Sequence, residues 1–420
     1  MNIAWHSAPA YFPTGYGVQT KGFCHRLMGL GHSVVVVTTT ATMGTVWEGL
    51  LHVPAGPDHP AVEGMYEWPR RLPIDVMITL MDAWTIPVEV LEMLKAMGVK
   101  WCPYAPVDHE PIPINVQDRL EHGAYNLAMS PFTLREFERV GLPNPRYLPH
   151  GVETKIFYPR PQHKEMLVAR NKFVVGIVSS NMEPMGRKGW VHAFDAYGKF
   201  HEKHEDTRLY VHCNPTRNDG GLDLIQMGKQ RGFEPYSPDI WQLMANIPAE
   251  KMAEIYSTFD VLMMLSGGEG FGIPLIEAQA CGTPVIATDF TAPRDLVGAG
   301  WKIPIVGKMH TPMNSYWGIP DVDAAVDALE EAYDLWKSEK LRKTMRDKAV
   351  AFAADFDFDL ITEKYLIPWL EEVEYGETTA PKSDERSGQE ASIDVSDGGV
   401  HNSELRKTPN KRSRSRRKKN

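Results

Sequence analysis

Residues 266–289, SGGEGFGIPLIEAQACGTPVIATD, constrain the fold more than any other stretch of this chain. The apolar run 261–265 precedes four closely spaced glycines, which is typical of a buried parallel strand that ends in a loop. Pro274 suits the first turn of a helix, where its missing amide would have no partner, and Gly282 followed by Pro284 ends that helix. A second apolar run follows. The stretch therefore predicts a strand, a glycine-rich loop, a short helix and the next strand of a parallel sheet.

Two carboxylates in this stretch indicate what the loop binds. The free amides and the positive dipole end of the helix would face the loop, which is how proteins hold phosphate. Glu269 stands inside the loop and would repel a bare phosphate, but it suits the hydroxyls of a sugar attached to one. Glu277 lies further along, inside the helix. We therefore expect a site for a phosphorylated sugar rather than an ordinary glycine-rich turn.

The rest of the chain alternates strands and helices in two series. The segment 143–161 is rich in proline, lacks a helical pattern and is predicted to be the hinge between two domains. This β/α alternation predicts an α/β protein with a parallel sheet in each series. The expected strands are 2–5, 33–39, 75–80, 99–102, 124–128, 173–178, 209–213, 261–265 and 285–287, and the expected helices include 19–30, 189–204, 238–246, 249–258, 321–353 and 359–373.

The length of 420 residues allows two domains and a large core. We place an N-terminal domain at 1–155, a second domain at 156–355, a returning helix at 356–375 and a tail at 376–420. The tail lacks aromatic residues and is rich in polar ones, so it cannot bury enough surface to fold by itself. Nine of the 45 Lys and Arg residues lie in 406–420, whereas the body of the chain is acidic.

Cysteine spacing and hydropathy indicate the environment of the protein. The four cysteines are scattered without a C-x-x-C pair, so we expect reduced thiols and neither a disulfide framework nor a zinc site. The first residues, MNIAWHSAP, do not resemble a secretion signal. No run approaches the roughly 18 apolar residues that span a bilayer. We therefore expect a cytoplasmic protein, with peripheral attachment to a membrane as an alternative.

Two further loops would lie at the carboxyl edges of the predicted sheets. In the segment NMEPMGRKGW, Arg187 and Lys188 precede a helix of the domain that holds the glutamate loop. Strand-end loops of one parallel sheet converge where ligands bind, so we expect this pair to neutralise a leaving diphosphate rather than to form a solvated turn. In the first domain, Gly15, Tyr16 and Gly17 precede a helix and suggest backbone close to a ligand, without the spacing of a dinucleotide site.

Together these motifs resemble the retaining glycosyltransferases of family 4. The most specific part is the Glu-(x)7-Glu pattern EGFGIPLIE at 269–277, followed by A-x-A-C-G-T-P-V-I-A-T. Three other elements stand in the order typical of the family: the TGYG loop, the interdomain LPHGVETKIFYP and the R-K-G at 187–189. The resemblance covers roughly residues 1–372. It implies the GT-B fold, in which two Rossmann-like, doubly wound parallel-sheet domains face a cleft and a C-terminal helix crosses back onto the N-terminal domain.

The resemblance also implies roles for individual residues. Glu269 would contact the hydroxyls of the donor sugar, and Glu277 would contact the ribose of the nucleotide. Arg187 and Lys188 would bind the diphosphate. The other donor contacts would come from the loop residues Gly270, Phe271, Gly272 and Ile273 and from the backbone of Gly17, while Gly15 and Tyr16 would lie on the acceptor side.

Some positions depart from the family pattern. Family members often carry a histidine that reaches the donor sugar, but this chain reads YAPVDHEPIP, so Asp108 or His109 could hold that place. His150 replaces the frequent asparagine before Gly151. ADFDFD at 354–359 contains the D-x-D spacing of metal-dependent transferases of the other fold, but its place between helical segments favours helix capping. We expect neither a catalytic metal nor a cofactor.

The implied reaction transfers a sugar from a nucleotide diphosphate sugar to an acceptor hydroxyl, with the anomeric configuration retained. The acceptor could be a glycan, a lipid, a protein or a small molecule, and we expect the loops 11–16 and 103–113 to meet it. The rival interpretations are a phage-type transferase that modifies DNA or a virion protein, a non-catalytic nucleotide-sugar-binding protein, and a sugar phosphorylase or epimerase. The basic end, 406–420, could contact nucleic acid or an anionic surface, or could be incidental.

Overall fold

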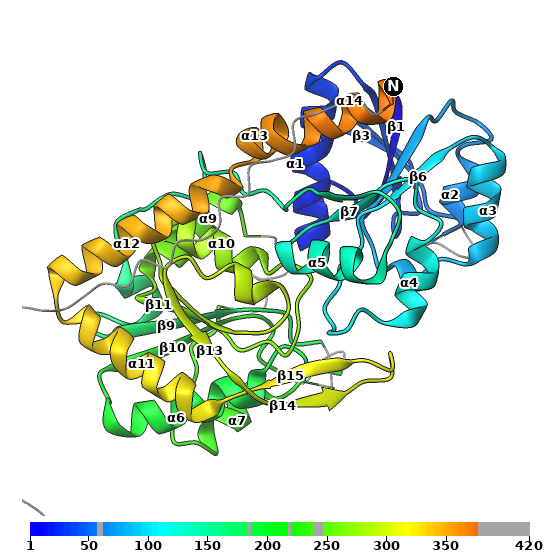
Figure 1. Cartoon of the computed structure of the whole chain (residues 1–420). Coiled ribbons are helices and arrows are strands. Elements are labelled where there is room, and N and C mark those ends of the chain that lie inside the picture. Colours follow the sequence, from blue (N-terminus) through cyan, green and yellow to red (C-terminus); the bar gives the residue numbers. More distant parts are fainter. Residues whose placement is uncertain (57–61, 183–185, 217–219, 239–246, 377–420) are drawn as a thin grey trace, which may run out of the picture. The chain divides into compact units, whose positions relative to one another are not determined.

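The computed structural model describes residues 1–56, 62–182, 186–216, 220–238 and 247–376. Residues Met1–Gly376 form one compact unit of alternating strands and helices (Figure 1). The expected α/β class is confirmed within these residues. The predicted helix at 238–246, apart from its first residue, and the tail from residue 377 lie outside the described residues. The boundary between the two domains near residue 155 stays a prediction.

The first sheet has six strands in the order β3-β4-β2-β1-β5-β6. All neighbouring strands are parallel except β3 with β4. The central β1 pairs Ile3 with Val34 of β2 on one side and with Val76 of β5 on the other. Such strands are apolar throughout because helices cover both faces of the sheet. The bounds are β1 Asn2–Ser7, β2 Ser33–Thr38, β3 Thr45–Trp47, β4 Leu50–Val53, β5 Val76–Thr79 and β6 Lys100–Pro103.

The second sheet has five strands, all parallel, in the order β10-β9-β11-β12-β13. Its central strand β11 carries the glycine-rich loop, and β12 is the strand predicted to follow the short helix. The bounds are β9 Phe173–Val178, β10 Thr207–His212, β11 Val261–Met264, β12 Val285–Thr288 and β13 Gly300–Ile303. The strand–loop–helix–strand unit predicted from 266–289 is therefore confirmed.

Two small sheets complete the strands. β7 (Asn126–Ala128) pairs in parallel with β8 (Pro145–Tyr147). β14 (Ile305–His310) and β15 (Tyr316–Pro320) form an antiparallel hairpin, which the sequence reasoning did not predict. Side chains along β14 alternate in exposure, and Asn314 in the connecting turn has a φ of 51°, so an asparagine at a turn position was the signal in the sequence.

The helices follow the predicted pattern with two corrections. The stretch 321–353 is helical as expected, but it consists of two helices, because Ser338 interrupts it and accepts a hydrogen bond from the amide of Leu341 at the start of the second helix. The expected continuous helix at 359–373 contains a π-helical turn at Thr362–Leu366 before Pro368, which cannot donate to a helical carbonyl. The bounds are α1 Gly15–Gly29, α2 Glu63–Glu67, α3 Val88–Ala96, α4 Ile114–Leu120, α5 Pro131–Val140, α6 Trp190–Lys203, α7 Leu224–Lys229, α9 Ala249–Thr258, α10 Ile273–Ala280, α11 Val322–Trp336, α12 Glu339–Ala353, α13 Phe358–Ile361 and α14 Ile367–Tyr375.

The C-terminal helices cross back to the first sheet, as expected. Figure 1 shows α13 and α14 lying beside α1 rather than beside α11 and α12. Lys100 at the start of β6 donates to the carbonyl of Val373 at 2.6 Å, and Arg146 pairs with Glu372. In the ADFDFD segment, Asp357 accepts hydrogen bonds from the first amides of α13, which confirms the capping interpretation.

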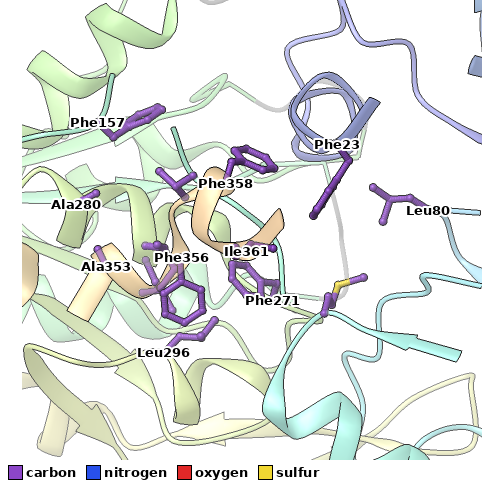
Figure 2. Packing of buried hydrophobic residues seen from close by; sticks show 14 of the residues in the cluster. Phe23, Leu80, Phe157, Phe271, Ala280, Leu296, Ala353, Phe356, Phe358 and Ile361 are labelled. Atoms are coloured by element: carbon purple, nitrogen blue, oxygen red, sulfur yellow. The ribbon is translucent and has the colours of Figure 1, made fainter. Parts of the chain in front are cut away.

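A buried seam joins α1, the hinge and α13. The ring of Phe358 lies against Gly22 and Gly151, and a methyl group at either glycine would overlap it. Figure 2 shows the Phe358 ring next to Phe23 of α1, and the two ring centroids are 5.3 Å apart. Beside this ring, the side-chain amide of Gln19 exchanges hydrogen bonds of 2.9 and 3.0 Å with the carbonyl and the amide of Gly151. The seam therefore holds α1 against the start of the hinge.

Across the residues that the structure describes, all four cysteines are free and buried. In the same residues, no helix is long and apolar enough to cross a membrane.

We expect Phe358→Ala to lower the free energy of unfolding by about 3–5 kcal/mol, because it leaves a cavity between two glycines that cannot fill it. Leu360→Ala is the matched control, since Leu360 lies two residues away and is 39% exposed, and it should cost far less. Chemical denaturation of the two variants measures the difference. Equal losses of stability would contradict the role of the seam.

Candidate active site

A cavity of about 970 Å³ lies between α1 of the first sheet and α10 of the second. Its walls come from the β1–α1 loop, the 106–108 segment, the hinge, the Arg187 loop and the glycine-rich loop before α10. These segments lie at or near the carboxyl ends of strands of both sheets, where parallel sheets bind ligands. The structure brings nearly all of the predicted site residues to this cavity; among those predicted, Gly17 and His109 do not line it.

The glycines of the 266–272 loop allow a close approach between two segments of the protein. A methyl group on Gly268 would overlap the carbonyl of Asp108, and one on Gly270 would lie 2.7 Å from Pro106. Gly272 stands at the start of α10 with a φ of 110°. A residue with a side chain would adopt this backbone conformation only with strain. The amino end of α10 therefore faces the cavity, with Ile273 and Pro274 in its wall.

Glu269 is the centre of a buried ion cluster. Its carboxylate accepts from the Lys188 ammonium at 2.8 and 3.0 Å and from the Arg187 guanidinium at 3.2 Å. Burial by itself would raise the pKa of Glu269, but the charges of Lys188 and Arg187 outweigh it and hold that pKa below its usual value. The predicted sugar-binding carboxylate and the two predicted diphosphate-binding cations therefore lie within hydrogen-bond distance of one another.

Asp108, and not its neighbour His109, lines the cavity. Asp108 lies 3.4 Å from Arg187 and accepts from His109 Nδ1 at 2.6 Å. His109 does not line the cavity; it is buried and packs its ring 5.0 Å from that of Trp317. Burial raises the pKa of Asp108, but the hydrogen bond from His109 and the charge of Arg187 lower it further. Of the two residues left open by the sequence, Asp108 is the one that can meet a ligand, and His109 orients it.

The predicted glycine loop of the first domain forms the first turn of α1. The hydroxyl of Thr14 caps the helix and accepts from the amide of Gly17 at 3.1 Å. A methyl group on Gly17 would overlap the carbonyl of Phe12, so this glycine serves the tight turn of the protein itself. Gly15 faces the second domain, because a methyl group there would lie 3.3 Å from Ile273. The helix consequently starts earlier than the predicted residue 19.

Tyr16 follows Gly15 and is half-buried among charged groups. Burial, together with the negative charges of Asp82 and Asp108, raises the pKa of its hydroxyl well above the usual value. Tyr16 therefore stays protonated and can donate a hydrogen bond into the cavity. Asp82 also lines the cavity, directly after β5, and the sequence reasoning missed it. Its signal was its position just beyond the predicted strand 75–80.

Glu277 lies one helical turn into α10, away from the ion cluster. It accepts a hydrogen bond of 2.8 Å from the hydroxyl of Tyr256 in α9, a second cavity residue that the sequence reasoning missed. Burial raises the pKa of Glu277 to about 7. The two glutamates of the motif are therefore in opposite electrostatic environments, and only Glu269 has cations beside it.

His150, which replaces the usual asparagine, forms part of the cavity wall between two rings. It is stacked on Phe271, with 5.2 Å between centroids, and lies 5.1 Å from Tyr104. Burial lowers the pKa of His150 to about 3, so the ring is neutral at physiological pH. Within the described part of the chain, no group of three or more His, Cys, Asp or Glu residues is placed to hold a metal ion.

Sequence comparison supports the resemblance for part of the chain. Residues 239–350 match the family described as glycosyl transferases group 1. A D-inositol 3-phosphate glycosyltransferase of Geodermatophilus obscurus is 35% identical over 80 residues, which are 19% of this chain and 18% of that protein. An MMP alpha-(1->4)-mannosyltransferase of Mycolicibacterium hassiacum is 28% identical over 152 residues, 36% of this chain and 33% of that protein. The matched segments thus span a third or less of these relatives.

Solved structures resemble the chain over nearly its whole described length. A sucrose-phosphate synthase from Thermosynechococcus elongatus gives a TM-score of 0.68 at 17% identity and covers 89% of this chain and 98% of its own. A glycosyltransferase from Rickettsia africae gives 0.65 at 17% identity, with 90% and 99% covered. An Anabaena protein, solved in complex with UDP and glucose, gives 0.59 at 15% identity, with 88% and 99% covered. The expected GT-B fold is confirmed, and residues 239–350 match the family of glycosyl transferases group 1.

Proposed function

We propose that this protein is an enzyme that transfers a sugar from a nucleotide diphosphate sugar to an acceptor hydroxyl, with retention of the anomeric configuration. The observation that carries the proposal is the cluster of Glu269, Lys188 and Arg187 beside the amino end of α10 in one cavity. The names of the relatives support it, since they include glycosyltransferases and a mannosyltransferase, and a structural neighbour was solved with UDP and glucose.

In this proposal the diphosphate lies between the two cations and the first amides of α10. The negative charge on the diphosphate grows as the bond to the sugar breaks, and fixed positive groups stabilise that change without having to reorganise. A bound diphosphate would share Lys188 and Arg187 with Glu269. The oxygens of Glu269 would then accept from the sugar hydroxyls, and Glu277, next to Tyr256, would accept from the ribose.

Retention is proposed to proceed on one face of the sugar without a covalent intermediate. Two carboxylates of the cavity wall, Glu269 and Asp108, are both engaged with cations, which makes them poor nucleophiles. The leaving diphosphate is then the base that receives the proton of the acceptor hydroxyl. Asp108 orients Arg187, while the Tyr16 hydroxyl is available to the sugar.

Lys188→Ala and Arg187→Ala should each lower the turnover number by roughly 10²–10³, because each removes a preorganised donor to the leaving group. Lys199→Ala is the control, since Lys199 is a half-exposed surface residue paired with Asp323, and it should keep normal turnover. The assay is release of nucleoside diphosphate from a nucleotide sugar. Near-normal turnover in both cluster variants, with folding verified by thermal melting, would sink the assignment.

A thermal-shift screen with UDP, GDP and ADP tests donor binding directly. A nucleotide that binds the native protein at 100 times its dissociation constant should stabilise it by about 2.7 kcal/mol. We expect one base to be preferred clearly over the other two. The proposal fails if none of the three raises the melting temperature.

Glu277→Gln should change two properties of the protein: the pH dependence of its stability and its affinity for the nucleotide. Because the carboxyl has a pKa of about 7 when folded and an ordinary value of 4.5 when unfolded, the folded protein binds more protons in this range. The stability of the native sequence should therefore fall as the pH rises from about 4.5 to about 7. The amide of the variant does not ionise, so its free energy of unfolding should not show this fall. Between pH 4 and pH 8 the variant should therefore gain up to about 3 kcal/mol of stability relative to the native protein, and less because water reaches the half-buried group.

The same variant should bind the nucleotide more weakly, because an uncharged amide replaces the carboxylate that accepts from the ribose. Glu363→Gln is the control, since Glu363 is exposed and should change neither property. Denaturant unfolding at pH 4 and pH 8 measures the first effect, and nucleotide titration measures the second. An identical pH profile for the native protein and Glu277→Gln would contradict the buried, protonated carboxyl.

A further inference from the structure

Another cavity, of about 660 Å³, lies beside the second sheet and shares none of its described wall residues with the candidate active site. Asp260 and Pro284, which directly precede β11 and β12, belong to its wall. This cavity therefore lies at the amino ends of these parallel strands, whereas the candidate active site lies at their carboxyl ends. The rest of the wall comes from the chain at 159–162 and from α11 and α12, which Figure 1 shows as neighbours.

Positive charge is in excess in this wall. Among its described residues, three carboxylates stand with five basic side chains, which are Arg160, Lys340, Arg342, Lys343 and Arg346. Two of the carboxylates have a cation of their own, because Asp260 pairs with Lys164 at 2.6 Å and Asp347 pairs with Lys343 at 2.6 Å. The third, Glu339, is exposed in the first turn of α12. Four of the five cations therefore have only this one carboxylate of the wall between them.

Arg342 and Arg346 provide the least compensated charges of the wall. They stand four residues apart in α12, so their side chains share one face of the helix. Arg346 donates to the carbonyl of Cys281 at 3.2 Å, which engages only part of a guanidinium that carries five N–H groups. Within the described residues, neither arginine forms an ion pair with a carboxylate.

The pKa of Arg346 reflects this environment. Burial is the main cause that lowers it, the charges of Asp260 and Asp347 oppose the fall, and the positive charge of Arg342 adds to it. The guanidinium stays protonated, because its ordinary pKa is far above physiological pH. Two like charges therefore lie close together in a cavity that is partly withdrawn from water. An anion between them would offset the cost of that arrangement.

Arg160 brings a third guanidinium to the same cavity from another segment of the chain. Its side chain is 17% exposed and donates to the carbonyl of Ile156 at 2.9 Å. The carboxylate of Glu254 lies 4.0 Å from Arg160 and already accepts from Lys251 at 2.8 Å. Planar guanidinium groups from two segments suit a phosphate, which has acceptor oxygens on all sides.

We infer that this cavity binds a small phosphorylated molecule, with the phosphate held by Arg160, Arg342 and Arg346. The volume is within the range of small-molecule sites and exceeds what a phosphate group by itself requires. Apolar wall residues such as Leu335 and Met345 suit the carbon part of the molecule. The inference concerns a site separate from the candidate active site and does not depend on the proposed sugar transfer.

Other roles for these arginines account for less of the arrangement. Arg346 stabilises the carboxyl end of α10, where a cation is favourable, but this role does not involve Arg342. A nucleic acid is held along an extended basic surface. Here Glu339 and Asp347 stand among the cations at exposed positions of α12, so the positive surface is short and favours a small ligand.

The test is titration calorimetry of the full chain with inorganic phosphate and with glycerol 3-phosphate. Glycerol and sodium chloride at matched ionic strength are the controls that lack phosphate, since salt alone screens exposed charges. We expect both phosphate compounds to bind and to raise the melting temperature, and neither control to do so.

Arg342→Gln locates the binding. The side chain of Arg342, unlike that of Arg346, makes no hydrogen bond within the described residues, so the variant should fold normally. It should raise the dissociation constant for phosphate roughly tenfold, as loss of a charge-assisted hydrogen bond does. Lys348→Gln is the matched control, because Lys348 is an exposed cation of α12 outside the wall, and it should leave the dissociation constant unchanged.

Lys188→Ala separates the two cavities, because the cations of the candidate active site could also attract phosphate. We expect a binding event that Lys188→Ala leaves unchanged and that Arg342→Gln weakens. Two results would overturn the inference. One is that Arg342→Gln alters no binding event of either phosphate compound. The other is that neither compound binds at concentrations up to tens of millimolar.

Discussion

The packing of Phe358 against two glycines is the contact on which the position of the cavity walls depends. Gly22 belongs to α1 and Gly151 to the hinge, and both lack a side chain where the ring lies. Gln19 reinforces the contact by pairing with both backbone groups of Gly151, so no buried polar group of that pair is left unsatisfied. Because the first turn of α1 places Gly15 and Tyr16 in the cavity wall, a shift at this seam would move one side of the cavity.

Charge balance among the buried ionic side chains is the second constraint on the cavity. Arg187 and Lys188 lie in a buried environment where unpaired cations would be costly, and Glu269 and Asp108 compensate them. The same arrangement links the glycine-rich loop to the 106–108 segment, since Gly268 packs on the backbone of Asp108. One cluster therefore holds the two sides together and places two cations in the cavity wall, where the proposed function has the diphosphate bind. Glu277 has no such compensation, and its raised pKa is the consequence.

Much of the fold and of the candidate site could be predicted from sequence patterns a few residues long. The strand, glycine loop and helix of 266–289 follow from apolar runs, Pro274 and Gly282, which act over a few residues. The sequence reasoning did not place the break at Ser338 and made no assignment for the hairpin β14–β15, because the signals for both are confined to a few residues. Gly17 shows a subtler limit: its spacing suggested a ligand, whereas a neighbouring carbonyl explains the glycine.

The sequence by itself determined the α/β class, the glycine loop and the residue types of the proposed donor site, because each depends on patterns within a short segment. Only the tertiary structure showed that Asp108 lines the cavity while His109 packs on Trp317, because Trp317 is distant in sequence and its position depends on the packing of the chain. It also decided that Glu269 pairs with Lys188 and that Glu277 pairs with Tyr256. These partners are distant in sequence, and only the packing of the chain determines which charges meet and which remain alone.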